Sequence, residues 1–264
     1  MTTLIIVQAR MTSTRLPGKV LLPLAGEPML TRLVERLRRV QRADGIVVAT
    51  TSNASDDPIA ALCTQLGVPC HRGSEHDVLS RYADAARLHA ADVVVRITSD
   101  CPLIDPALVD HVIAAYEERC SDYASNMLPP TWPYGMAVEV FSSAVLAQVH
   151  ADAIQDAERE HVTPFIYWHP DRYRLHNVVS PVDLSHHRWT VDTPEDYELV
   201  CRLFDTLYPI LPNFNQDDVL KLLFARPDWM AINQHISQKL VIKSGNTRGS
   251  PSVPPRLLAE PVSK

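Results

Sequence analysis

Short apolar runs rich in β-branched residues alternate with longer amphipathic stretches from the start of the chain onward. The runs predict strands at residues 4–9, 45–51, 68–72, 92–98, 136–141, 175–179 and 188–191. The amphipathic stretches predict helices at 29–40, 57–66, 77–89, 106–119, 143–150 and 194–207, followed by two last helices at 216–224 and 228–238. Such alternation is typical of an α/β fold with a mostly parallel sheet between helices, in which ligands bind at the carboxyl ends of the strands.

The length and composition indicate one large domain and a short tail. A chain of 264 residues can bury one large core, and we expect this domain to span residues 1–240. Residues 241–264 are rich in Pro, Ser and Gly and show little apolar periodicity, so we expect a disordered tail there.

The charge and cysteine content exclude several classes of protein. A formal net charge of -6 argues against a general nucleic-acid binder, which would carry a broad basic surface. Five cysteines without a CxxC pair favour a reducing cytoplasm over a disulfide scaffold. No apolar run approaches the roughly 18 residues of a membrane span. We therefore expect a cytoplasmic protein without nucleic-acid or membrane partners.

The loop after the first strand, "QARMTSTRLPGK", carries three cations, Arg10, Arg15 and Lys19. The glycine spacing fits neither the dinucleotide fingerprint nor a P-loop. A solvated surface turn is one interpretation. The other is a site for an anionic ligand, because arginine offers a planar fork to phosphate oxygens and lysine a compact point charge.

The stretch "QARMTSTRLPGKVLLPLAGEPML" resembles the N-terminal signature of the cytidylyltransferases that make CMP-activated acidic sugars, such as the acylneuraminate and 3-deoxy-manno-octulosonate cytidylyltransferases. The pieces "DVLSRYADAA", "ADVVVRITSDCPLID", "VEVF", "REHVTPFIY" and "RWTVDTPEDYELV" resemble a narrower group, the spore-coat polysaccharide biosynthesis F-type proteins. The resemblance implies a Rossmann-like nucleotidyltransferase fold, a GT-A-like three-layer sandwich with a mixed sheet. It also implies CTP as donor and Mg²⁺ as cofactor.

Two aspartates are candidate metal ligands. Asp100 follows the strand predicted at 92–98, and the resemblance makes it a Mg²⁺ ligand; the alternative, a helix N-cap, suits Asp105 better. Asp192 precedes Thr193 and Asp196, which already provide a helix start, and its family counterpart is close to the metal. The alternative for Asp192 is a turn residue. If both carboxylates share one site, they would repel each other without a cation.

The remaining candidate residues line the two substrates. The resemblance assigns nucleotide contacts to Gln8, Ala9, Arg10, Ser13, Arg15, Lys19, Arg81 and Ser99. For Arg81 the alternative is a surface charge. Glu139 alternates with Val138 and Val140, so its side chain could reach an acceptor pocket, and the resemblance suggests a sugar-side or dimer-side role for His161.

We expect a Mg²⁺-dependent cytidylyltransferase that moves CMP from CTP to an acidic sugar, with Asp100 and the three loop cations as catalytic groups. The alternatives are a GT-A-type glycosyltransferase, although Asp100 is followed by Cys101-Pro102 instead of a DxD motif, and a non-catalytic nucleotide-binding subunit. Tyr134 and Ala137 stand where the family commonly places acids, which puts the acceptor in question. A homodimer is a further expectation.

Overall fold

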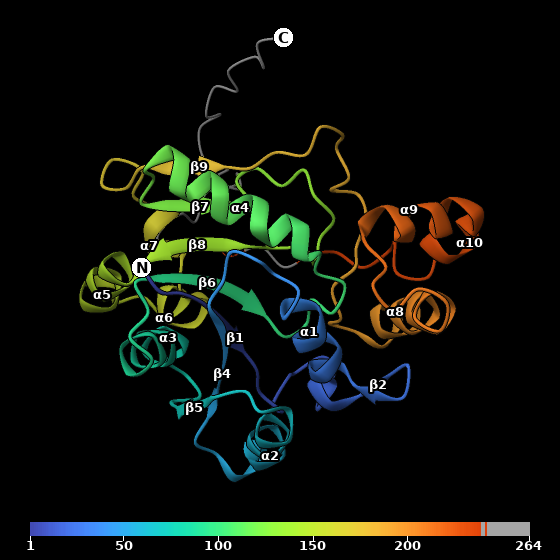
Figure 1. Cartoon of the computed structure of the whole chain (residues 1–264), viewed down its shortest axis with the longest axis horizontal. Coiled ribbons are helices and arrows are strands. Elements are labelled where there is room, and N and C mark those ends of the chain that lie inside the picture. The colour runs from blue at the N-terminus through green and yellow to red at the C-terminus, as the bar shows by residue number, and fades with distance from the viewer. Residues whose placement is uncertain (239–240, 242–264) are drawn as a thin grey trace.

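The computed structural model of the chain describes residues 1–238 and 241, which are built around a seven-stranded sheet (Figure 1). The strands lie across the sheet in the order β5 (Cys70–Gly73), β4 (Gly45–Thr51), β1 (Thr3–Gln8), β6 (Val93–Thr98), β8 (Glu139–Ser142), β7 (Tyr123–Ser125) and β9 (Leu175–Asn177). The first four strands are parallel, β8 is antiparallel to β6 and β7, and β9 is parallel to β7. The sheet is therefore mixed and mostly parallel, as the sequence predicts.

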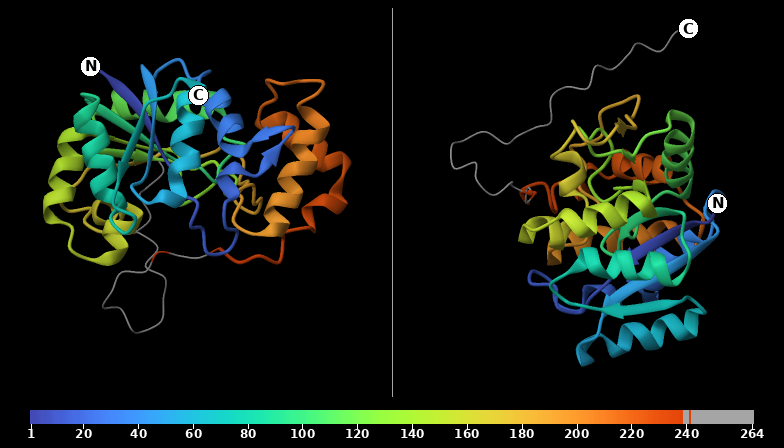
Figure 2. Two further views of the ribbon diagram at one scale, coloured as in Figure 1. Left: turned by 90° about the horizontal axis from the view of Figure 1, so that it is seen from below. Right: turned by 90° about the vertical axis from the view of Figure 1, so that its left-hand side faces the viewer.

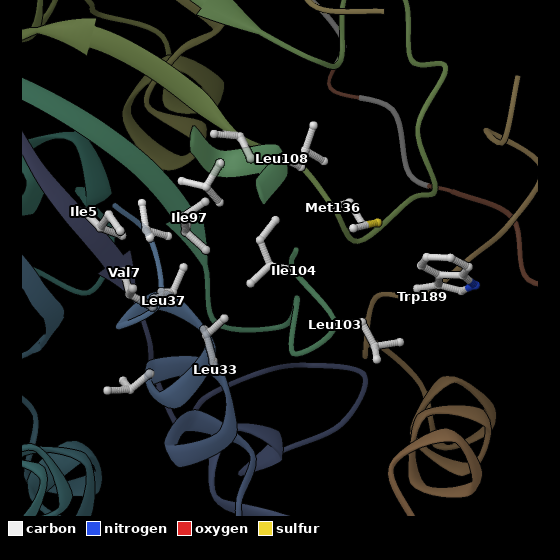
Figure 3. Packing of buried hydrophobic residues seen from close by; sticks show 14 of the residues in the cluster. Ile5, Val7, Leu33, Leu37, Ile97, Leu103, Ile104, Leu108, Met136 and Trp189 are labelled. Carbon is white, nitrogen blue, oxygen red and sulfur yellow. The ribbon is translucent and has the colours of Figure 1, made fainter. Parts of the chain in front are cut away.

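Alternate residues of each strand supply two cores, one on each face of the sheet. On β1, Ile5 and Val7 belong to the first core, and Leu4 and Ile6 belong to the second. This division follows from the strand geometry, in which successive side chains point to opposite faces. Figure 3 shows the first core, where Ile5 and Val7 lie near Leu37 of the first helix.

Helices cover both faces of the sheet, which gives the expected three layers (Figures 1 and 2). The first core includes residues of α1 (Met29–Leu37), α2 (Asp57–Leu66), α4 (Pro106–Arg119), α8 (Pro194–Leu207) and α9 (Gln216–Ala225). The second includes residues of α3 (Val78–Leu88), α5 (Ser143–Asp152) and α7 (Pro164–Tyr167), together with Val162, which follows α6 (Asp156–His161). Two 3₁₀ turns, η1 (Lys19–Leu21) and η2 (Ala54–Asp56), a hairpin of β2 (Pro23–Leu24) and β3 (Glu27–Pro28), and the short α10 (Pro227–Met230) complete the elements.

Six of the seven predicted strands appear in the sheet, with shifted ends, as β1, β4, β5, β6, β8 and β9. The strand predicted at 188–191 is wrong, because that segment forms only one isolated bridge, between Tyr134 and Arg188. Both edges of β8 are already paired with β6 and β7. The segment is held instead by the loop beside it, where Tyr134 N donates to His187 O (2.9 Å) and Trp189 N donates to Tyr134 O (2.6 Å).

The helix predicted at 228–238 is also wrong, since α10 ends at Met230. The Asn233 amide nitrogen donates to Arg188 O and Asp196 Oδ1, both at 2.9 Å, and these tertiary contacts draw the segment out of a helical course. Within the described part of the chain, no helix is long and apolar enough to cross a membrane. The tail predicted at 241–264 lies outside the described residues except for residue 241, and the domain bounds 1–240 stay a prediction.

Candidate functional site

The candidate site lies at the carboxyl ends of the adjacent strands β1 and β6. The chain moves from β1 outward to β4 and β5, then returns to the other side of β1 with β6, so the connections diverge between β1 and β6. A crevice at such a switch point is the usual ligand site of an open α/β sheet. Residues 9–19 leave β1 here and residues 99–101 leave β6. A third segment joins them, because Val191 N donates to Asp100 O at 2.8 Å.

Lys19 connects the two predicted metal ligands. Its ammonium donates to Asp100 Oδ2 (3.0 Å), Asp192 Oδ1 (2.8 Å) and Val191 O (2.7 Å). The residue is only 7% exposed. The other Asp100 oxygen, Oδ1, accepts from the Thr98 hydroxyl at 2.6 Å. The structure therefore brings three predicted residues, far apart in sequence, into one buried ion cluster.

A second set of cations holds the remaining oxygen of Asp192. Asp192 Oδ2 lies 2.9 Å from Arg15 Nη2 and 3.3 Å from Arg188 Nη2. Arg188 also donates to both oxygens of the fully buried Asp196, at 2.8 Å each. Sequence reasoning missed Arg188. Its only signal in the sequence was the arginine that begins the motif "RWTVDTPED". The predicted helix start is confirmed, because Thr193 and Asp196 form a capping box.

These contacts perturb the proton affinities of the cluster. Burial on its own would lower the pKa of Lys19, but the neighbouring Asp100 and Asp192 raise it above its ordinary value. Burial would likewise raise the pKa of Asp100, yet the Lys19 ammonium and the hydrogen bond from Thr98 lower it to about 2. Both groups are therefore charged at neutral pH.

The donor set of the cluster suits a hard divalent cation. Magnesium typically takes one or two protein carboxylates and completes its shell with phosphate oxygens and water. Asp100 and Asp192 provide two carboxylates that share one cationic partner, and the Asp100 side chain is 26% exposed toward the crevice. Within the described residues no cluster of three or more His, Cys, Asp or Glu could form a closed metal site. The residues present thus fit an open Mg²⁺ site.

The first half of the cation-bearing loop is anchored on the β4 side of the crevice. Asp56 Oδ1 accepts from Met11 N at 2.9 Å, and Thr12 Oγ1 donates to Glu75 Oε1 at 2.6 Å. Ala9 is buried and continues the pairing with β4 through its N–H. Ser13 lies half-buried in the same loop. The loop is thus a supported structure and not a freely solvated turn.

Arg81 is buried under the same side of the crevice, which contradicts a surface charge. It is 2% exposed on α3, and its Nε and Nη1 have no hydrogen-bond partner among the described residues. Burial lowers its pKa. Leaving buried guanidinium donors unpaired costs free energy, so the position favours a ligand that supplies acceptors.

Gln8 and Glu139 belong to a separate polar network on the second face of the sheet. Arg96 Nη2 donates to Gln8 Oε1 at 3.0 Å, and Arg96 Nη1 also pairs with Glu139. Glu139 Oε1 accepts from the hydroxyls of Tyr123 and Thr163, both at 2.5 Å. Glu139 is 7% exposed, so a direct contact with a substrate would compete with three existing donors. Sequence reasoning did not anticipate Arg96.

His161 reaches this region through an unusual turn. It ends α6, and the next residue, Val162, has a φ of 73°, a value that β-branched residues rarely adopt. Thr163 N donates to His161 O at 2.9 Å and closes a γ-turn. Burial lowers the pKa of His161, although Glu160 opposes the shift. The turn places His161 beside Thr163, which contacts Glu139.

Not all predicted residues meet in one cluster. Arg15, Lys19, Asp100 and Asp192 do. Arg10 Nη2 instead lies 3.8 Å from Glu160 Oε1 of α6, and within the described part of the chain it forms no ion pair with that cluster. Ser99 is buried at the end of β6 and donates its N–H to Gln8 O at 3.1 Å. The site therefore has an ion cluster on one side of the crevice and the Gln8–Arg96–Glu139 network on the other.

Comparison with known proteins agrees with this geometry. Residues 4–220 match the family model of the cytidylyltransferases. The spore coat polysaccharide biosynthesis protein SpsF of Bacillus subtilis is 36% identical over 232 residues, which cover 85% of this chain and 95% of that protein. A solved cytidylyltransferase from Leptospira borgpetersenii is 31% identical with a TM-score of 0.83, covering 91% of this chain and 100% of that one.

A more distant solved structure shares the fold. It is a CMP:2-keto-3-deoxy-manno-octonic acid synthetase complexed with CTP, 18% identical with a TM-score of 0.59, covering 78% of this chain and 99% of that one. At that identity the likeness supports the fold alone. The family model spans most of the chain, and SpsF matches nearly end to end. The chain therefore belongs to the cytidylyltransferase family.

Proposed function

We propose that the chain transfers CMP from CTP to an acidic sugar, a nonulosonic or ulosonic acid, with release of pyrophosphate for surface polysaccharide biosynthesis. The observation that carries the proposal is the cluster of Arg15, Lys19, Asp100 and Asp192 at the switch point of the sheet. The likeness to SpsF supports the pathway class, and the CTP complex of the synthetase with the same fold supports the donor.

The donor nucleotide would lie across the loop that follows β1. Arg10, Arg15 and Lys19 would neutralise the β- and γ-phosphates, where charge builds as pyrophosphate leaves. Gln8, Ala9, Ser13 and Ser99 would line the nucleoside. The unpaired Nε and Nη1 of Arg81 would donate to the adjacent O2 and N3 acceptors of cytosine. Uracil carries a hydrogen on N3, so the same guanidinium would favour CTP over UTP.

Asp100 and Asp192 would hold Mg²⁺, and the bound ion would polarise the α-phosphate and lower the pKa of the attacking hydroxyl. The anomeric hydroxyl oxygen forms a bond to the α-phosphorus as the bond between that phosphorus and the pyrophosphate oxygen breaks. The hydroxyl proton leaves to solvent or to a base of the site. The chain's own contribution is positioning and charge neutralisation, which dominate catalysis of such transfers.

The acceptor would bind on the side of the crevice that holds Glu139 and His161. Glu139 would act mainly by fixing Arg96, Tyr123 and Thr163, since its oxygens are already engaged. Tyr134, which replaces a family acid, packs against Arg188, with 5.5 Å between the guanidinium carbon and the ring centre. Acceptor recognition there would therefore rest on an aromatic ring and not on a carboxylate.

A pyrophosphate-release assay with CTP, ATP, GTP and UTP, each against a panel of ulosonic and nonulosonic acids, tests the proposal. We expect release only with CTP, Mg²⁺ and one class of acid. Lys19→Ala should slow turnover by roughly 100- to 1000-fold, the usual effect of losing one transition-state donor. Lys221→Ala, which removes an exposed lysine on α9, is the matched control. Equal release with all four nucleotides, or none with any acid, would contradict the proposal.

A further inference from the structure

The Lys19 ammonium already occupies the place between the two carboxylates. An ammonium has three N–H donors, and all three are used, by Asp100 Oδ2, Asp192 Oδ1 and Val191 O. In this arrangement the side chain has no donor left for a phosphate oxygen. The residue that should bind the triphosphate is instead bound to the residues that should bind the metal.

One site cannot serve both cations at once. A divalent ion shared by Asp100 and Asp192 would take the same oxygens that now accept from Lys19, and it would repel the ammonium at contact distance. The displaced ammonium would then be buried without an anionic partner, with at most the Val191 carbonyl left to accept from it, which is costly. A triphosphate removes this cost, because its β- and γ-oxygens can accept from the displaced ammonium.

We infer that Lys19 is an internal place-holder cation, which keeps Asp100 and Asp192 from binding a divalent metal until a nucleoside triphosphate accepts its ammonium. The inference rests on the proposed function and adds an order to it: metal and triphosphate enter together. By linkage, each then raises the affinity for the other by the same factor. Free Mg²⁺ would not accumulate in the nucleotide-free protein.

Arg15 provides a matched comparison within the same cluster. It also neutralises Asp192, but through Oδ2, and among the described residues it forms no ion pair with Asp100. Removing Arg15 therefore removes the same unit of charge near the carboxylates without vacating the position between them. If only the general electrostatic effect mattered, removing Lys19 and removing Arg15 would raise the metal affinity equally. If Lys19 is a place-holder, removing Lys19 raises it more.

The test is a titration of Mn²⁺, followed through the paramagnetic resonance of the free ion, into nucleotide-free wild type, Lys19→Met and Arg15→Met. We expect Lys19→Met to bind Mn²⁺ about 10-fold or more tighter than wild type, within the range usual for coupled sites. Arg15→Met should change Mn²⁺ affinity much less. Equal gains in the two variants, or no gain in Lys19→Met, would overturn the inference. Neither result depends on turnover, so a failure here is distinct from a failure of the pyrophosphate assay.

A second measurement uses the wild-type protein, in case Lys19→Met does not fold. With lysine labelled by ¹³C at Cε, the Lys19 signal is the one that is missing in Lys19→Arg. We expect it to stay in place when Mg²⁺ alone is added and to shift when Mg²⁺ and CTP are added together. A full shift with Mg²⁺ alone, or nucleotide binding that leaves the signal unmoved, would overturn the inference.

Discussion

Gly135 is the point where the loop 133–136 touches the segment that carries Asp192, and Gly135→Ala should separate the two. The glycine has a φ of 107°, and a Cβ there would lie 2.3 Å from Thr190 N and 2.5 Å from Trp189 C. The positive φ alone costs a residue with a Cβ about 1–2 kcal/mol. Overlap with backbone atoms, which cannot rotate away, adds roughly 1–3 kcal/mol. We therefore expect a total loss of about 2–5 kcal/mol of unfolding free energy.

Gly67→Ala is the control for the conformational part of that cost. Gly67 ends α2 with a φ of 65°, and a Cβ added there meets nothing within 4 Å. We expect it to lose only about 1–2 kcal/mol. Urea unfolding of both variants measures the difference in unfolding free energy. In thermal unfolding, the melting temperature of Gly135→Ala should lie roughly 10 °C below that of wild type, at 2–4 °C for each kcal/mol. Equal losses in the two variants would refute the close approach of the two segments.

Three further predictions concern the ion cluster. Asp100→Asn and Asp192→Asn should each fold and lose most Mg²⁺-dependent turnover. The double variant should turn over little more slowly than the slower single variant, because the pair acts as a unit. Full activity of Asp192→Asn at limiting Mg²⁺ would make Asp192 a turn residue. The folded-state pKa of Asp100 lies below its ordinary value, at about 2, so the stability it contributes should be complete above its ordinary pKa and decline as the pH falls toward 2. Unfolding of wild type and Asp100→Asn at pH 2 to 6 checks this, and a pH-independent difference would contradict it. Arg188→Gln should cost about 3–5 kcal/mol by leaving the buried Asp196 unpaired, whereas Arg226→Gln, at an exposed pair, should cost at most about 1 kcal/mol by the same unfolding assay; similar losses would argue against a buried network.

Much of the fold could be predicted because its strands are long enough to show a pattern. β1, β4 and β6 are six or seven residues of almost continuous apolar sequence, as expected for strands covered on both faces. β7 has three residues, too few for any periodicity to be visible. The segment 188–191 shows the opposite error, because β-branched residues there reflect burial and not pairing in the sheet.

The candidate site also has a part that the sequence predicts and a part that it does not. Asp100 lies just past the end of β6, and Arg15 and Lys19 lie on the loop that leaves β1, so the position of the strand ends predicts that they meet. Arg188 pairs with Asp192 and Asp196, four and eight residues further along, but it lies in a non-helical segment that shows no repeating pattern. The Asn233 contact joins residues 37 or more positions apart, which leaves no local pattern. The placement of Lys19 between two acids also depends on side-chain geometry that no spacing reveals.

The central claim is that the chain catalyses attack on the α-phosphorus of CTP with pyrophosphate as the leaving group. Phosphorus NMR of the wild-type enzyme with CTP, Mg²⁺ and the acidic sugars of the panel tests it most directly. The account predicts that the three CTP signals give way to one phosphodiester signal of a CMP-sugar and to pyrophosphate in equal molar amount. Formation of CDP and inorganic phosphate, or unchanged CTP with every acid, would contradict it.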